Sequence, residues 1–386
     1  MNIALVSREY PPETLVGGIG TYTHHVARAL AGRGHTVHVI TETAAGAADS
    51  LEQGVVVHRL PRSRAPIREL RGRARAGAVA RTVDAIRPLD VVQACEYAAE
   101  GLVVARQKRV PLITRLATPR FVIDEIEGRS SVRGKVFADR YEREQTLRSR
   151  AVISSTHALA QRVGQAWGIP AGGIDVIPNA LNLAGLRQLA GGARREPPPA
   201  GSPYVIYFGR LEERKGVPVL AEAMRAILRE RKDLHLVLAG AERSAGTVGG
   251  EVRARLSEAE GRVHLTGLLP PASLLPLVAG ATLAVLPSLW EAFGFVVLEA
   301  MALGVPVVAT SGSGFAEIVQ DGVSGRLVPP GDAAALEMGV RALLGDETLR
   351  RRLGNGARHR AEQFDTGRVC ERLEALYERV RNGSGR

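Results

Sequence analysis

The chain alternates short apolar runs with longer segments of helical pattern along almost its whole length. The runs include NIALVS, DVVQA, AVISS, YVIYFG and LHLVLAG. Strands that are buried on both faces read as continuous apolar runs, and parallel strands need long crossover connections, usually helices. The alternation therefore predicts an α/β protein built from parallel sheets with crossover helices.

The length of the chain predicts more than one such unit. A chain of 386 residues is longer than a single hydrophobic core usually serves. A stretch rich in Gly, Pro and Arg, ending in GGARREPPPAGSP, interrupts the pattern before the run YVIYFG begins it again. We therefore expect two α/β domains and a last helix. The expected bounds are 1–180 for the first domain, 181–203 for a linker, 204–364 for the second domain and 365–386 for the last helix.

Composition narrows the setting in which the protein works. No stretch approaches the roughly 20 apolar residues of a membrane span, and Met1 leads straight into a strand-like run. We therefore expect a cytoplasmic protein. Cys95 and Cys370 match no metal-ligand spacing and are expected to be reduced thiols.

The formal net charge is +11, and many of the arginines lie between Arg59 and Arg87. A basic, partly helical segment is suited to weak association with an anionic membrane surface or a polyanion. The alternative is a solvated helix in a chain rich in Arg and Ala. No aromatic residue interleaves these arginines, so nucleic acid is not an expected partner.

Two carboxylates, Glu291 and Glu299, bracket an apolar segment that follows a strand-like run ended by Pro287. The carboxyl ends of strands are where open α/β sheets bind ligands. Gly294 in this segment lets a ligand approach the main chain and the free N–H groups of a helix start. Carboxylates here are suited to accept hydrogen bonds from sugar or ribose hydroxyls. Taken alone, Glu291 is also consistent with an ordinary acid in the first turn of a helix, and Glu299 with an ordinary helix residue.

Two cations lie in the loop after the run YVIYFG. Arg210 offers a planar fork and Lys215 a compact charge, and together they are suited to neutralise a diphosphate. The alternative is a pair of surface cations that bind Glu212 and Glu213.

Glycines open the first predicted helix, where Gly17 and Gly18 follow the first strand-like run. This arrangement lets the backbone approach phosphate at a helix start. The glycine spacing is not that of the dinucleotide fingerprint, and a tight structural turn is the alternative.

The pattern of Glu, seven residues and Glu, with Phe-Gly-Phe inside and GVPVVAT after it, resembles the retaining glycosyltransferases of family 4. The resemblance implies the GT-B fold, in which two Rossmann-like domains face each other across a cleft and the last helix crosses back onto the first domain. It also implies transfer of a sugar, with retained configuration, from a UDP-, GDP- or ADP-linked donor. The acceptor, whether small molecule, thiol, lipid or glycan, stays open.

The resemblance implies that Arg210 and Lys215 bind the donor diphosphate, that Glu299 binds the ribose and that Glu291 binds the transferred sugar. Arg210, Lys215 and Glu291 are the expected catalytic residues. The chain has no Asp-x-Asp motif, so neither a metal nor a cofactor is expected. The full set of expected donor-binding residues is Gly17, Gly18, Gly209, Arg210, Lys215, Thr266, Gly267, Leu268, Glu291, Phe293, Gly294, Phe295, Glu299 and Glu317.

Two strand-end segments of the first domain are expected to bind the acceptor. Their expected contacts are Glu96, Tyr97, Arg115, Ala117 and Thr118. Members of the family commonly have histidine where this chain has Ala117, and that histidine is assigned to positioning the transferred sugar or the acceptor. Either the reaction proceeds without it, or alanine here replaces a native histidine.

Two other classes of function fit parts of the same sequence. A nucleotide-sugar epimerase or hydrolase of the same fold would use the donor-binding residues without an acceptor. A non-catalytic basic protein that docks on a membrane or polyanion would use the arginine-rich segment alone.

Overall fold

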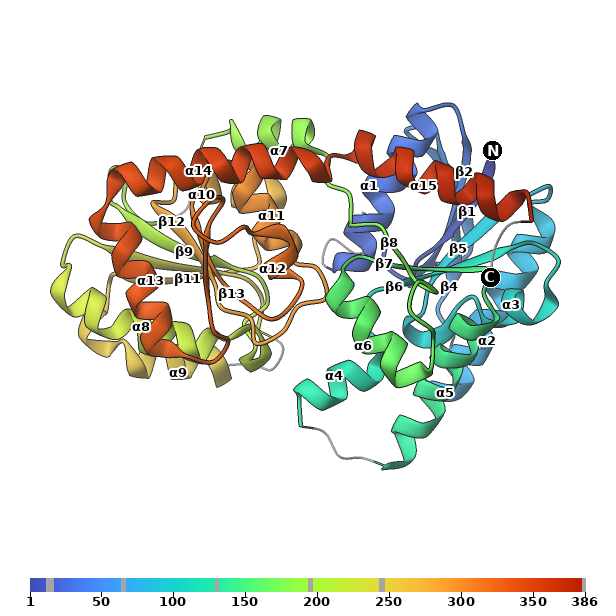
Figure 1. The fold of residues 1–386 in the computed structure, drawn as a ribbon, viewed down its shortest axis with the longest axis horizontal. Coiled ribbons are helices and arrows are strands. Elements are labelled where there is room, and N and C mark those ends of the chain that lie inside the picture. The colour runs from blue at the N-terminus through green and yellow to red at the C-terminus, as the bar shows by residue number, and fades with distance from the viewer. Residues whose placement is uncertain (12–16, 64–66, 129–131, 194–196, 243–246, 384–386) are drawn as a thin grey trace. The chain divides into compact units, whose positions relative to one another are not determined.

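The computed structural model describes residues 1–11, 17–63, 67–128, 132–193, 197–242 and 247–383 (Figure 1). The chain divides into two compact units. Unit 1 comprises Met1–Ala180 and Thr366–Arg386, and unit 2 comprises Leu181–Asp365. Each unit is a mainly parallel sheet with crossover helices, so the predicted α/β class is confirmed.

The sheet of unit 1 has the strand order β3-β4-β2-β1-β5-β6-β7-β8 within the described residues. Its strands pair in parallel except that β3 runs antiparallel to β4. Every residue of β5, β6 and β7 is buried, which is why these strands read as continuous apolar runs. The strands are β1 (Asn2–Val6), β2 (Thr36–Thr43), β3 (Ala48–Glu52), β4 (Val55–Pro61), β5 (Val91–Cys95), β6 (Leu112–Leu116), β7 (Ala151–Ser154) and β8 (Asp175–Val176).

Capping residues in the sequence set the two ends of helix α6 in unit 1. Thr156 caps α6 by accepting a hydrogen bond from the Leu159 N–H, and Gly168 ends that helix in a left-handed conformation. The helices and helical turns are α1 (Gly18–Gly32), α2 (Arg68–Ala85), η1 (Tyr97–Ala99), α3 (Leu102–Gln107), α4 (Arg120–Ile126), α5 (Val132–Arg148), α6 (His157–Trp167) and α15 (Thr366–Arg381).

The last helix, α15, belongs to unit 1 and lies beside α1, red beside blue in Figure 1. Arg33 donates two hydrogen bonds to Glu374 of α15, at 2.7 and 2.8 Å. Farther along, Arg379 donates to Asp175 at 2.6 Å. The apolar face of the helix, which includes Leu373, is buried. This face explains why a helix with so many charged residues still packs.

The sheet of unit 2 is parallel and has the order β11-β10-β9-β12-β13-β14. Numbered within the unit, this is the doubly wound order 3-2-1-4-5-6, and the winding reverses between β9 and β12. Ligands of such sheets bind outside the carboxyl ends of the strands at this reversal. The strands are β9 (Tyr204–Phe208), β10 (His235–Ala239), β11 (Val263–Gly267), β12 (Leu283–Leu286), β13 (Val307–Thr310) and β14 (Arg326–Val328).

The segment 181–203, expected to be a linker, lies in unit 2 and contains helix α7 (Leu183–Ala190). Asn182 caps this helix through the Gly185 N–H, and Leu183 and Leu186 are buried. The helix packs on α10 and α11 because its apolar residues need cover. The other helices and helical turns of unit 2 are η2 (Glu213–Lys215), α8 (Val217–Glu230), α9 (Thr247–Arg255), η3 (Ser257–Ala259), α10 (Pro271–Ala279), α11 (Phe295–Ala302), α12 (Phe315–Ile318), α13 (Ala333–Gly345), α14 (Glu347–Ala361) and η4 (Glu362–Phe364).

Among the described helices, none combines the length and the apolar character that crossing a bilayer requires.

Candidate active site

The loops after β9, β12 and β13 meet at the carboxyl edge of the unit 2 sheet. A Cβ added to Gly216 would lie 1.9 Å from the Pro287 carbonyl oxygen, so the first two loops touch through their main chains. The Gly314 N–H donates to the Glu291 carbonyl at 2.9 Å and joins the third loop to the second. Glycine is needed at these contacts because a side chain would not fit. The three loops form one packed cluster at the topological switch point.

Lys215 and Glu291 form a buried ion pair within this cluster. The Lys215 Nζ donates to Glu291 Oε1, and the two side chains are 15% and 11% exposed. Ser288 Oγ donates to the same carboxylate oxygen at 2.9 Å. Burial opposes ionisation of Glu291, but the Lys215 charge and these hydrogen bonds outweigh it and lower the Glu291 pKa. Burial also lowers the Lys215 pKa, and the Glu291 charge offsets part of that effect.

The other expected cation, Arg210, is bound to an acid at the cluster's rim. Its Nε lies 2.9 Å from Glu212 Oε1, and Arg214 Nε lies 3.4 Å from the second oxygen of the same carboxylate. Arg210 is 49% exposed and Glu212 is 6% exposed. The alternative pairing with Glu212 is therefore present in the structure, and it leaves half of the Arg210 side chain open to solvent. Arg214, which the sequence reasoning did not select, is a third cation of this loop.

Glu299 lies on α11 and differs from Glu291 in its surroundings. Among the described residues, no hydrogen bond or ion pair reaches its carboxylate, which is half-buried. Burial raises the pKa of Glu299 to about 7. A carboxyl group in this state gains stability from any hydroxyl donor that reaches it.

Helix α11 begins at a position that requires glycine. Gly294 has a φ of 106°, and a Cβ there would lie 2.1 Å from Phe315 Cε1. Within the described residues no side chain caps the helix start, so its first N–H groups are open to a ligand. The Phe293 ring is buried and packs edge-on to Phe295 at 5.5 Å, so Phe293 offers a ligand only its main chain.

The remaining unit 2 residues of the expected donor site lie along the same sheet edge. Thr266 and Gly267 end β11, and the following Leu268 is 58% exposed. Gly209 follows β9 with a φ of 134°. Glu317 lies on α12, which follows β13.

In unit 1, Gly17 precedes α1 and lies against a carboxylate. A Cβ on Gly17 would lie 1.9 Å from Glu9 Oε2, and its φ is 140°. Gly18 is the first residue of the helix. The close approach of Glu9 is one structural reason for glycine at position 17. Residues 12–16, between the strand and this glycine, are outside the described residues.

The expected acceptor residues of unit 1 fall into two groups. Glu96 and Arg115 are buried and bind the protein's own groups. Glu96 Oε2 accepts from the Ala117 N–H at 2.8 Å. The Arg115 guanidinium lies 3.9 Å from the Tyr22 ring centroid and donates to the Ile177 carbonyl at 2.9 Å. Their direct contact with an acceptor stays a prediction, and in the structure both side chains are buried.

The other three expected acceptor residues, Tyr97, Ala117 and Thr118, are half-buried at the carboxyl ends of β5 and β6. A fourth residue that joins their loops escaped the sequence reasoning. Glu142 of α5 accepts from the Ala98 N–H at 3.0 Å and from the Arg120 N–H at 2.8 Å. No spacing or motif marks this glutamate, because it lies in the charged run YEREQ.

Two arginines of the arginine-rich segment are buried and bound to acids, and the others whose burial is described are exposed. Arg59 is 9% exposed and binds Glu52 at 2.7 Å, and Arg75 is 3% exposed and binds Glu100 at 3.1 Å. Arg71 is among the exposed residues of α2. Within the part of the chain that the structure describes, no group of three or more His, Cys, Asp or Glu side chains forms a metal-ligand cluster.

Solved structures share this architecture. The chain is similar to sucrose-phosphate synthase from Thermosynechococcus elongatus, with a TM-score of 0.81, 24% identity and 98% of both chains covered. It is also similar to HepE from Anabaena in complex with UDP and glucose, with a TM-score of 0.73, 22% identity, 98% of this chain and 99% of the other. The protein therefore has the GT-B fold of two Rossmann-like units, as the resemblance implied.

Sequence comparison gives the family. Residues 16–184 match the family model of Glycosyltransferase Family 4, and residues 193–360 match that of Glycosyl transferases group 1. Glycogen synthase of Mycobacterium tuberculosis is 29% identical over 99% of this chain and 96% of its own length. The chain belongs to the glycosyltransferases of the family 4 type, and the predicted family is confirmed.

Proposed function

We propose that the protein moves a sugar, with retained anomeric configuration, from a nucleotide-diphosphate sugar to an acceptor. The observation that carries this proposal is the largely buried Lys215–Glu291 pair at the switch point of unit 2, followed on helix α11 by Glu299, whose carboxyl group no described residue binds. One part of this site carries positive charge, and another offers carboxylate oxygens that accept hydrogen bonds from hydroxyl groups. A nucleotide sugar has a diphosphate for the first and sugar and ribose hydroxyls for the second.

The main catalytic task in this proposal is to stabilise the leaving diphosphate. Its negative charge grows as the glycosidic bond breaks, and fixed cations in a partly dry site stabilise that charge strongly. Lys215 supplies a buried positive charge, and Arg210 supplies an exposed guanidinium that can turn toward a ligand. Gly209 beside Arg210 allows close approach of phosphate to the main chain. In this proposal the chain's own cations do the work of a bridging metal, and Gly17 and Gly18 remain expected donor contacts of unit 1.

The two acids take the hydroxyl groups of the donor. Among the described residues Glu299 has no partner to give up, so a ribose hydroxyl adds a hydrogen bond to its carboxylate. Glu291 already binds Lys215 and Ser288, so its position is fixed before a sugar arrives. The open N–H groups at the start of α11 add donors for further sugar oxygens. We do not assign Glu291 the part of a covalent nucleophile.

The donor base is proposed from a fold neighbour. The HepE structure contains UDP and glucose, so UDP-glucose is the first donor to test, followed by GDP- and ADP-linked sugars. In the proposal the acceptor binds the loops of unit 1 that contain Tyr97, Ala117 and Thr118.

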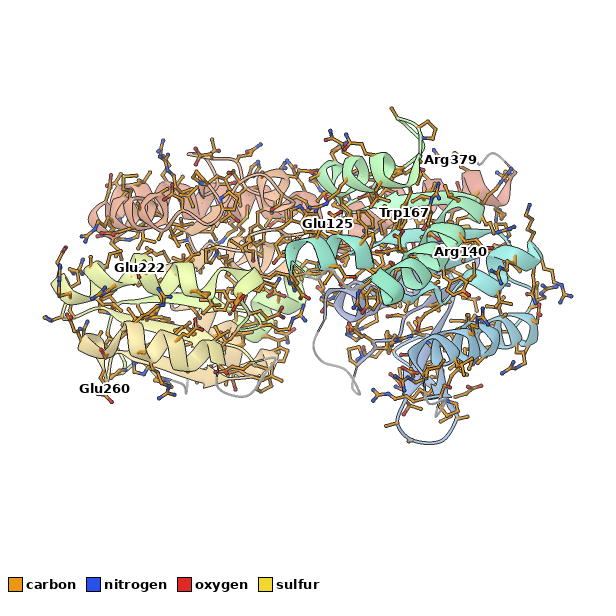
Figure 2. The ribbon with its side chains drawn as sticks, turned by 90° about the horizontal axis from the view of Figure 1, so that it is seen from below. Glu125, Arg140, Trp167, Glu222, Glu260 and Arg379 are labelled. Atoms are coloured by element: carbon orange, nitrogen blue, oxygen red, sulfur yellow. The ribbon has the colours of Figure 1, made fainter. Side chains whose placement is uncertain are left out.

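Calorimetric titration with UDP and with UDP-glucose, in the presence of EDTA, tests the donor site. We expect binding to the native protein and a loss of about tenfold or more in Glu299→Ala, which removes a charged acceptor. Glu222→Ala is the matched control, because Glu222 is an exposed acid of α8 in the same unit (Figure 2). Equal affinity in both variants, or a strict metal requirement, would contradict the proposal. Release of free sugar from donor alone would instead indicate a hydrolase.

A further inference from the structure

Two buried carboxyl groups lie together at the carboxyl edge of the unit 1 sheet. Glu96 follows β5, Glu142 lies on α5, and their exposed fractions are 0% and 1%. Neither forms an ion pair with Arg, Lys or His among the described residues. Unpaired acids in such a place are costly to bury, and other polar contacts must compensate.

The compensating contacts are main-chain N–H groups of two loops. Glu142 accepts from Ala98 N at 3.0 Å in the loop after β5, and from Arg120 N at 2.8 Å in the loop after β6. Glu96 accepts from Ala117 N at 2.8 Å. The carboxylate pair therefore ties the two loops to each other and to α5.

The first of these loops has a conformation that needs such support. Ala98 and Ala99 have φ values of 62° and 50°, in the left-handed region that alanine avoids. Strained residues of this kind persist only where surrounding contacts hold them. The hydrogen bond from Ala98 N to Glu142 is such a contact.

Helix α5 is itself anchored, so the Glu142 carboxyl group has a fixed position. Trp167, at the end of α6, donates from Nε1 to Asp139 of α5 at 3.1 Å. Figure 2 shows Trp167 beside the stretch of α5 that carries Arg140. One turn beyond Glu142's position, Gln145 accepts from Gly101 N at 2.8 Å and donates to the Cys95 carbonyl at 2.9 Å. The inward face of α5 therefore holds the loop after β5 at two points.

We propose that Glu142, together with Glu96, is a positioning residue that fixes the two loops carrying Tyr97, Ala117 and Thr118. The inference rests on the proposed function where it calls these loops the acceptor side. It adds that their order depends on a buried carboxylate pair and not on the donor site of unit 2.

The proposal has a pH signature. Burial raises the pKa of Glu142 to about 8 and that of Glu96 to about 7. The groups that face them are the Cys95 thiol and the Tyr97 N–H near Glu96, and Asp139, Glu96 and the Arg120 N–H near Glu142. Opening of the loops would expose both carboxyl groups to water, where they ionise at lower pH, so the raised pKa values favour the closed loops only while the groups are protonated. The loops should therefore become less well ordered as pH rises toward about 8.

Glu142→Gln in the full chain tests the inference by amide hydrogen exchange. A glutamine amide retains one acceptor and places its NH₂ against the other N–H, so one of the two bonds is lost. We expect exchange in the segments 97–101 and 117–121 to quicken about tenfold, with strands β1 and β7 unchanged. Glu144→Gln is the matched control, since Glu144 lies on the same helix, is partly exposed and binds Arg106 and Arg148.

Two further readouts separate positioning from general loss of structure. In the native protein, loop protection beyond the intrinsic pH effect should fall as pH rises toward about 8, and Glu142→Gln should reduce that fall. The dissociation constant for UDP should be the same in both proteins. Unchanged loop exchange in Glu142→Gln, or protection independent of pH, would overturn the inference. Absence of UDP binding in the native protein would instead overturn the proposed function and leave the loop result standing.

Discussion

Lys215 and Glu291, which were expected to bind different parts of a donor, bind each other in the structure. The two side chains are only 15% and 11% exposed, and they lie where the winding of the unit 2 sheet reverses. The pair joins the loop after β9 to the loop after β12 before any ligand binds. Because of this contact, a substitution of Lys215 should change both the catalytic rate and the stability of the protein, and the two effects can be measured on the same variant.

Lys215→Ala should harm both turnover and stability. Breaking a buried pair by removing one partner leaves an uncompensated charge and costs about 3 to 5 kcal/mol. Loss of one charged contact to the leaving group costs about 100- to 1,000-fold in rate. Thermal unfolding and turnover with saturating UDP-glucose measure the two effects. The double variant Lys215→Ala/Glu291→Ala should recover part of the stability and none of the rate. A near-native rate in Lys215→Ala would refute the diphosphate assignment.

Donor affinity should depend on pH through Glu299. The free group has a pKa of about 7, and a hydroxyl that binds its ionised form lowers that pKa in the complex. Binding then releases a proton near neutral pH, and affinity falls as pH drops below about 7. Calorimetry of UDP binding in buffers of different ionisation enthalpy measures the released proton. Glu299→Gln should release none, and an identical proton count in both proteins would contradict the assignment.

Unit 1 should lose stability as pH rises from the acid side. Glu142 has a folded pKa of about 8, raised by burial above its ordinary value of 4.5, so the unfolded chain gives up its proton first. The stabilising contribution is therefore complete below about pH 4.5 and is lost as pH rises to about 8. The change is on the order of 5 kcal/mol.

Denaturant unfolding at several pH values tests this stability change. Trp167 lies in unit 1 and Trp290 in unit 2, so Trp290→Phe leaves one fluorescent reporter for unit 1. In that background, Glu142→Gln should flatten the pH dependence of the free energy of unfolding. A slope that Glu142→Gln leaves untouched would show that other groups cause it.

Gly294→Ala should disrupt the start of α11. The added Cβ would meet Phe315 at 2.1 Å, and the φ of 106° disfavours any side chain. We expect a loss of roughly 2 to 3 kcal/mol in unfolding free energy together with weaker UDP binding. Gly312→Ala is the control, because Gly312 has a φ of 76° and a Cβ added there would meet no described atom within 4 Å. Equal effects of the two variants would assign the loss to backbone strain alone.

The alternation of apolar runs and helical segments was enough to predict the fold class. Buried parallel strands need continuous apolar sequence, and crossover helices need a different period, so both leave a local signal. The same signal places Glu291, Glu299, Arg210 and Lys215 at strand ends and helix starts of one domain. The resemblance to family 4 then implied a role for each of these residues, and the family was confirmed.

Tertiary structure decided which partner each side chain has. The Lys215–Glu291 pair, the burial of Glu96 and Arg115, and the two N–H groups held by Glu142 join residues far apart in sequence. Tertiary structure also decides that helix α7 forms in the expected linker, because a short amphipathic helix forms only where another surface covers its apolar face. Local sequence sets strands, helices and the edge where loops gather. Long-range packing alone fixes whether an acid at that edge binds a lysine or a backbone N–H.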